Sequence, residues 1–79
     1  MIYIVKSELR IDDRLIDVFI HSFAYDTEEK AKEFIEGRIK DMVKFEDYTK
    51  VNDTTIERVD FAGSKTTHEY IIESLVKDF

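Results

Sequence analysis

The chain has 79 residues, with 12 basic and 18 acidic side chains, a net charge of −6, and no cysteine or proline. This length fits a single domain, residues 1–79, and the missing cysteines exclude a disulfide framework and a thiolate metal site. An acidic chain is a poor candidate for direct binding to nucleic acid, which requires a basic surface. An acidic surface can instead imitate nucleic acid and occupy the nucleic-acid-binding groove of a protein.

The apolar runs of the sequence are much shorter than a membrane span. The first residues, MIYIVKSE, lack the basic segment and the long apolar run of a secretion signal. We therefore expect a soluble protein of the cytoplasm. A chain of this size has a thin hydrophobic core, for which association with a second copy is a common remedy.

A β-hairpin is expected at the start of the chain, from residues 2–9 and the stretch 15–25, LIDVFIHSFAY. If Asp12 and Asp13 form its turn, Val5 lies opposite Ile20. One face of the hairpin would then carry Tyr3, Val5, Leu9, Ile16, Val18 and Ile20. The other would carry Ile2, Ile4, Leu15, Phe19, His21, Phe23 and Tyr25. The second strand is thus apolar on both faces, whereas a half-buried strand alternates apolar and polar residues.

A charged helical pattern follows and fades near Phe45. Asp26 and Glu29 have the spacing of a capping box at its start. Glu28 and Lys32 are spaced for an i,i+4 ion pair on the exposed side of the helix. The apolar stripe at helical spacing consists of Ala31, Phe34, Ile35, Ile39, Met42 and Val43.

The last third of the chain is expected to form a second hairpin. Residues 54–62 read as a strand, Gly63 and Ser64 as a two-residue turn, and residues 65–79 as a strand that pairs back with Val59 opposite His68. Residues 66–79 could instead form a helix, because Thr66 has capping spacing and apolar residues follow it. We favour the strand. Residues 46–53 have too little pattern to assign.

The expected fold class is α+β: an antiparallel sheet of about four strands with one helix packed on one face, in the order ββαββ. One helix covers one face, so the other face must meet water or another apolar surface. We expect a second copy or a partner protein to cover it. The candidate interface residues are Ile4, Phe19, His21, Phe23 and Tyr25. In the alternative, residues 46–53 fold across this face as a lid.

Catalytic and metal-binding motifs are not evident. The two histidines, His21 and His68, are far apart in the sequence and belong to no HExxH motif, so we expect no metal site. The acidic start of the helix would repel a phosphate group. His21 fits a partly buried structural role, and Ser64 fits a turn better than a nucleophilic site. We expect neither an enzyme nor a cofactor.

Three segments, the opening YIV-x-S, the run DTEEKAKEFIE and the closing EYIIESLV, resemble a group of small uncharacterised proteins common in phages and prophages of low-GC bacteria. In those proteins a short hairpin precedes a (S/T)xEKAxEFI helix and a C-terminal strand. The resemblance implies a setting in which small accessory proteins bind a host protein or sequester a host signal. It implies no functional residue, and this chain has a longer segment after its helix.

The main functional hypothesis is a small, acidic, non-enzymatic and homodimeric protein, encoded by a phage or mobile element, that binds and inhibits a host protein in the host cytoplasm. A defence nuclease complex is the candidate target, in an anti-CRISPR-like role. A basic partner would meet an acidic helix face made of Glu29, Glu33, Glu36 and Asp41. One alternative is a dimer that sequesters a nucleotide signal in a cleft with Lys6, Arg10 and Arg14. The other is a structural accessory subunit.

Overall fold

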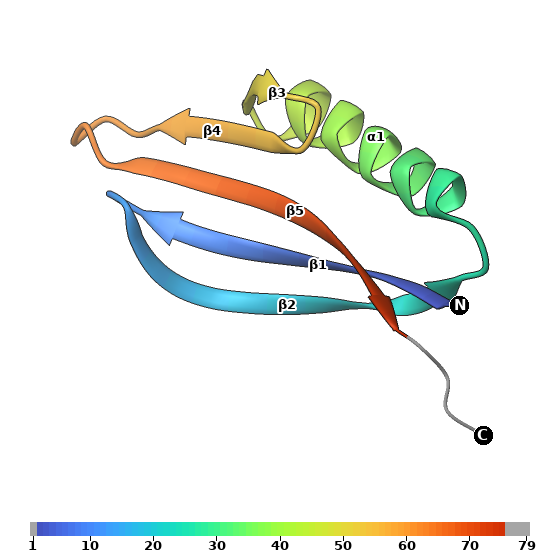
Figure 1. Ribbon diagram of the computed structural model, residues 1–79. Helices are drawn as coiled ribbons and strands as arrows, with labels where there is room; N and C mark the ends of the chain where they lie inside the picture. The colour runs from blue at the N-terminus through green and yellow to red at the C-terminus, as the bar shows by residue number, and fades with distance from the viewer. Residues whose placement is uncertain (1, 76–79) are drawn as a thin grey trace.

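The computed structural model describes residues 2–75, apart from the side chains of residues 22 and 23 (Figure 1). Its elements are β1 (Ile2–Ile11), β2 (Arg14–Tyr25), α1 (Glu28–Phe45), β3 (Thr49–Asn52), β4 (Thr55–Val59) and β5 (Lys65–Leu75). The five strands form one antiparallel sheet in the order β2-β1-β5-β4-β3, and α1 lies on one side of it. The α+β class is confirmed.

The predicted four-strand ββαββ arrangement is wrong, because the sheet has five strands in the order ββαβββ. The additional strand is β3, which forms at one edge of the sheet from the segment that the sequence left unassigned. Residues 65–75 are a strand, as favoured, and not part of a helix. β5 pairs with β1 on one side and β4 on the other, so two neighbours fix its extended conformation.

The turn of the first hairpin is confirmed. Asp12 and Asp13 have φ angles of 51° and 67°, as a two-residue type I′ turn requires. The turn is also tied to the start of β5. The Asp12 N–H donates to the Lys65 carbonyl, and the Asp12 carboxylate accepts from the Lys65 N–H, both at 2.9 Å.

The predicted register of this hairpin fails beyond its first pairs. Next to the turn Ile11 lies opposite Arg14, as expected, but an irregularity between Leu9 and Arg10 shifts the pairing by one residue. Ile20 therefore lies opposite Lys6 and not opposite Val5. Since neighbouring residues point to opposite faces, a one-residue shift exchanges the two faces of β2.

The candidate interface residues consequently divide between the two faces. We call the side that carries buried Val5 and Ser7 the covered face, because α1 packs against it, and the other side the open face. Phe19 lies opposite Ser7, and the His21 ring contacts Phe34 of α1, so both belong to the covered face. Their predicted placement on the open face is wrong.

Two further interface candidates lie on opposite faces of the sheet. Tyr25 packs on Phe34 from the covered face, with ring centroids 6.0 Å apart, so its predicted placement on the open face is also wrong. Ile4 lies on the open face, as expected, because it neighbours buried Val5 in β1. The side chain of Phe23 lies outside the described residues.

The hydrophobic core lies between α1 and the covered face. Its buried members are Val5, Ala31, Ile35, Ile39, Tyr48, Ile56 and Tyr70. Most of the predicted helical stripe is buried or packed against this core, but Val43 is exposed. Tyr48 is part of this core on the covered face. The hypothesis that residues 46–53 form a lid over the open face is therefore wrong.

The start of α1 differs by one residue from the predicted capping box. Thr27 is the N-cap, and its hydroxyl oxygen accepts a hydrogen bond from the Lys30 N–H at 3.2 Å. Asp26 instead forms an ion pair with the Lys30 ammonium group at 2.9 Å. The predicted pair of Glu28 with Lys32 is present at 3.4 Å.

Replacing Gly37 with alanine should raise the free energy of unfolding by about 0.5–1 kcal/mol. Gly37 is exposed in the middle of α1, and a Cβ atom there would meet nothing within 4 Å. Alanine therefore brings better helix propensity without a clash. Urea denaturation of both proteins measures the change, and a loss of stability would contradict the exposed position of Gly37.

Candidate functional site

The open face of β1, β4 and β5 is largely charged and internally paired. Four ion pairs cross it, namely Lys6–Glu73 at 2.9 Å, Arg10–Glu8 at 3.1 Å, Arg10–Glu69 at 3.4 Å and Lys65–Glu57 at 3.3 Å. Paired and solvated charges of this kind are stable in contact with water. Where these charges pair, the open face therefore needs no protein cover.

The same pairs bear on the nucleotide-sequestering alternative. Lys6 and Arg10, two of its three proposed cations, are already bonded to carboxylates of the same sheet. Glu73 also raises the pKa of Lys6 by accepting its hydrogen bond. A phosphate group would have to displace these carboxylates, so the open face offers little net attraction for an anion.

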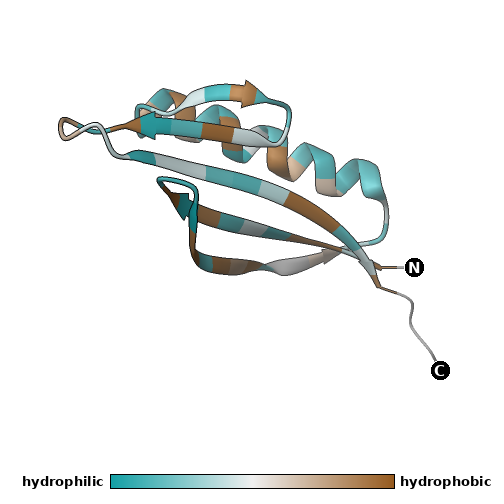
Figure 2. Ribbon diagram, turned by 60° about the vertical axis from the view of Figure 1, so that its left-hand side comes forward, coloured by the Kyte–Doolittle hydropathy of each residue, from teal (hydrophilic) through white to brown (hydrophobic). Residues whose placement is uncertain are grey.

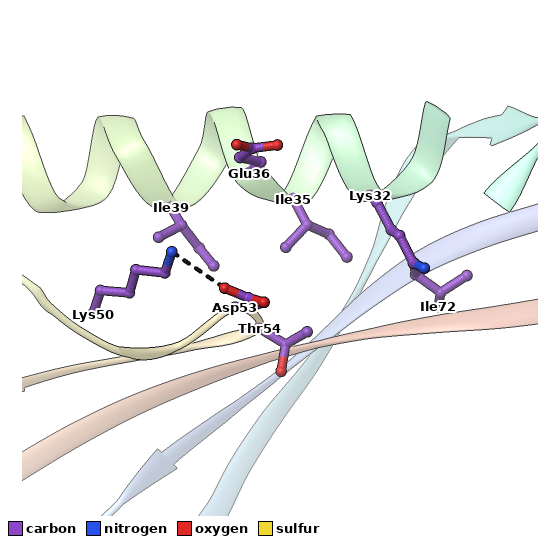
Figure 3. Close-up of a pocket in the computed structure, with 8 residues that line it drawn as sticks. All are labelled: Lys32, Ile35, Glu36, Ile39, Lys50, Asp53, Thr54 and Ile72. Atoms are coloured by element: carbon purple, nitrogen blue, oxygen red, sulfur yellow. Dashed lines mark ion pairs between the residues drawn. The ribbon is translucent and has the colours of Figure 1, made fainter. Parts of the chain in front are cut away.

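A cleft of about 360 Å³ lies between α1 and the β3–β4 turn (Figure 3). Its volume is within the range of small-molecule sites. Its lining is aliphatic at the centre and charged at the rim, with Lys32, Ile35, Glu36, Ile39, Lys50, Asp53, Thr54 and Ile72. Lys50 pairs with Asp53 at 3.3 Å, and the rim holds two cations and two anions. The cleft therefore shows no preference for a ligand of either charge.

Both histidines lie on the covered face in polar pairs that the sequence did not reveal. His21 Nε2 is 3.3 Å from the Ser7 hydroxyl, and His68 Nε2 is 3.1 Å from the Tyr48 hydroxyl. The partners come from separate elements, so only the fold brings them together. Ser7 is 2% exposed, which keeps its hydroxyl from any substrate. We therefore interpret these pairs as structural.

Burial lowers the pKa of both His21 and His68, and the positive charge of Arg38 lowers it further. Burial also raises the pKa of the Tyr70 hydroxyl. The two histidines are consequently neutral at pH 7. A positive charge on either ring would stand between α1 and the sheet, close to Arg38.

The exposed apolar side chains of the first hairpin are concentrated on β2. Residues 11–20 are all exposed, and β2 is an outermost strand of the sheet. Figure 2 shows several hydrophobic segments along it. Four aliphatic side chains are 44–70% exposed, namely Leu15, Ile16, Val18 and Ile20. The aliphatic residues of this stretch up to Ile20 are thus not buried within the described chain.

A second exposed apolar group lies at the β4–β5 connection. The predicted two-residue turn is wrong, because Val59 pairs with Lys65 and a five-residue loop separates them. Gly63 donates to the Asp60 carbonyl at 3.1 Å and has φ 84°, which favours glycine. The Asp60 carboxylate accepts from the N–H groups of Ala62 and Ser64, both at 2.9 Å.

Phe61 projects from this loop with its side chain fully exposed, and Val59 beside it is 61% exposed. Both residues border a hollow of about 580 Å³, which Asp47 and Asp60 also line. Arg58, the cation of this hollow, lies over the Tyr48 ring at 4.8 Å and donates to the Glu46 carbonyl. We call Asp47, Val59, Asp60 and Phe61 the tip surface: an apolar centre with two carboxylates.

The predicted acidic helix face is exposed but not dominated by negative charge. Glu29, Glu33, Glu36 and Asp41 are all exposed. Residues 28–45, however, contain five acidic and five basic side chains, so α1 carries no net charge. The net charge of −6 arises outside the helix, and a basic partner has no reason to prefer α1.

In residues 2–75 no helix is long and apolar enough to cross a membrane. The same part of the chain contains no group of three or more His, Cys, Asp or Glu side chains that could hold a metal ion. No family model, curated protein or solved structure matches the chain closely enough to assign a relationship.

Proposed function

We propose that the protein is a non-enzymatic binding module, encoded by a phage or mobile element, that inhibits a host protein by docking its tip surface on a basic groove of that protein. The observation that carries the proposal is the fully exposed ring of Phe61 on a loop fixed by four hydrogen bonds. Exposed aromatic rings that a rigid backbone holds in place are typical anchors of protein interfaces.

Charge supports a basic partner. Asp47 and Asp60 border Phe61, and the chain as a whole carries a net charge of −6. Complementary charge speeds the encounter of two proteins and selects among partners. Nucleic-acid-binding proteins expose basic grooves, so a nuclease of a host defence system is the target class that this surface fits best. Occupation of that groove would exclude the nucleic acid.

Affinity capture from a bacterial host lysate tests the proposal with the variant Phe61→Ser. We expect the wild-type chain to retain a basic protein that binds nucleic acid, and the variant to retain at least tenfold less of it, because loss of an interface anchor commonly costs 2 kcal/mol or more. High salt should weaken the capture.

A matched control is Phe45→Ser, which removes another exposed phenylalanine. Phe45 is 68% exposed and does not line the hollow of the tip surface. This variant should retain the partner as the wild type does. Equal capture by wild type and Phe61→Ser would show that the tip surface is not the docking site.

A further inference from the structure

The two edges of the sheet differ in their protection against further strand pairing. β3 is four residues long and carries Lys50. A short length and a lysine are features that keep edge strands from pairing with other chains. β2 has twelve residues, and its outer side has no neighbour in the described sheet. The edge that is open to another strand is therefore β2.

The exposed aliphatic side chains of β2 form one row on the open face. Val18 and Ile20 lie opposite Glu8 and Lys6, whose side chains point to that face. Leu15 lies opposite Arg10 on the same face, and the irregularity beside it leaves Ile16 as the extra residue of a β-bulge. Ile16 precedes Val18 by two residues, and side chains two residues apart in a strand point to the same face. The row is thus continuous from Leu15 to Ile20.

We propose that a second copy of the chain occupies this edge, with two β2 strands paired antiparallel about a twofold axis at Val18. The two five-stranded sheets then become one sheet of ten strands, whose helices lie on the same side. The biological role of this dimer rests on the proposed function, since a dimer presents two tip surfaces to a partner. The pairing itself depends only on β2.

Symmetry restricts the register. Opposite residues of an antiparallel pair point to the same face, so a symmetric pairing must centre on one residue. A centre at Val18 places Val18 opposite Val18 and Ile16 of each copy opposite Ile20 of the other, so these three aliphatic residues of each copy meet. A centre at Asp17 would set two carboxylates against each other, which is unfavourable.

Charge also favours this edge for contact between copies. Two chains of net charge −6 repel each other over most of their surface. β2 contains one cation, Arg14, and one anion, Asp17, so its formal charge is zero with His21 neutral. Repulsion is therefore weakest where the two strands meet. Added salt should strengthen the dimer, because it screens the repulsion between the remaining charges.

Asp17 is expected to limit the strength of the dimer. Its carboxylate accepts a hydrogen bond from the Val18 N–H at 2.8 Å. A second β2 strand needs this N–H for a backbone hydrogen bond, so the carboxylate competes with the partner strand. The variant Asp17→Ala removes both the competing acceptor and a negative charge, and should lower the dimer dissociation constant severalfold.

The lack of cysteine in the chain allows a direct test. In the proposed register a cysteine at Val18 faces its own symmetry mate, at a distance that a disulfide spans. We expect Val18→Cys to form a covalent dimer under mild oxidation. Val51→Cys is the matched control, because Val51 is a half-exposed valine on β3 at the opposite edge. It should remain monomeric on a denaturing gel.

Light scattering on the unmodified chain completes the test. We expect twice the mass of 9.4 kDa for the wild type, and a folded monomer for Ile20→Lys, which places a charge in the aliphatic row. A wild-type monomer at several hundred micromolar, or a Val51→Cys cross-link without a Val18→Cys one, would overturn the pairing. The monomeric variant Ile20→Lys should still capture the partner protein, because this capture needs only the tip surface. The capture assay therefore tests the proposed function separately from the dimer.

Discussion

Replacing Ile56 with alanine is expected to lower the free energy of unfolding by about 3 kcal/mol. Ile56 lies in β4 and is 0% exposed, and it is one of the two largest fully buried side chains of the described chain. It belongs to the core cluster beneath α1. Shortening it removes buried methyl groups and leaves a cavity that the surrounding strands cannot close.

This loss is large for such a small protein. A domain of this length has a total stability of roughly 4–12 kcal/mol, so the variant should unfold at a much lower urea concentration. Ile56→Val removes a single methylene group and should cost only about 1 kcal/mol. Val51→Ala is the exposed control, since Val51 is 52% exposed on β3, away from the proposed dimer contact, and should change stability little. Equal losses at Ile56 and Val51 would contradict the assignment of the core.

Elements that depend on local signals were predictable from the sequence. The charged, periodic pattern placed α1, and two consecutive aspartates marked the type I′ turn at Asp12 and Asp13. Both signals act within a few residues, so they do not require knowledge of the rest of the fold. The missed β3 has only four residues, all exposed, and its extended form depends on pairing with β4.

The errors arose where one residue decides the outcome. The irregularity beside Arg10 shifts the β1–β2 pairing and moves Phe19 to the other face, yet no sequence signal marks it. At the second hairpin, Gly63 suggested a two-residue turn, but the Asp60 carboxylate stabilises a longer loop. An aspartate three residues before a glycine is a signal for a type I turn that could have indicated this loop.

The candidate surfaces were predictable only in part. The two-faced apolar stretch of β2 correctly indicated an uncovered surface, because its composition does not depend on register. Its location at a sheet edge required the strand order, which follows from the long-range pairing of β1 with β5. The tip surface escaped notice because Phe61 was assigned to a strand, where an aromatic residue is ordinary.

Stability should fall as the pH is lowered from 7.5 to 5, because His21 and His68 are both neutral in the folded chain. Burial, the largest cause, and then Arg38 lower the pKa of each below its ordinary value of 6.5; Arg58 adds to the effect at His68. The unfolded chain therefore binds more protons over this range, and the free energy of unfolding decreases with falling pH. The stability that the two neutral histidines contribute is fully present above pH 6.5, and it is lost as the pH falls towards their pKa values in the folded chain.

Thermal denaturation between pH 7.5 and 5 measures this effect, and the double variant His21→Gln, His68→Gln isolates its source. Glutamine can still hydrogen-bond to Ser7 and Tyr48 but has no proton to gain in this range. Its melting temperature should therefore depend less on pH than that of the wild type. Asp26, whose pKa the Lys30 hydrogen bond lowers, titrates below this window and does not disturb the comparison. Equal pH slopes for the two proteins would mean that the histidines are not the groups that couple protonation to folding, and that α1 tolerates charge beneath it.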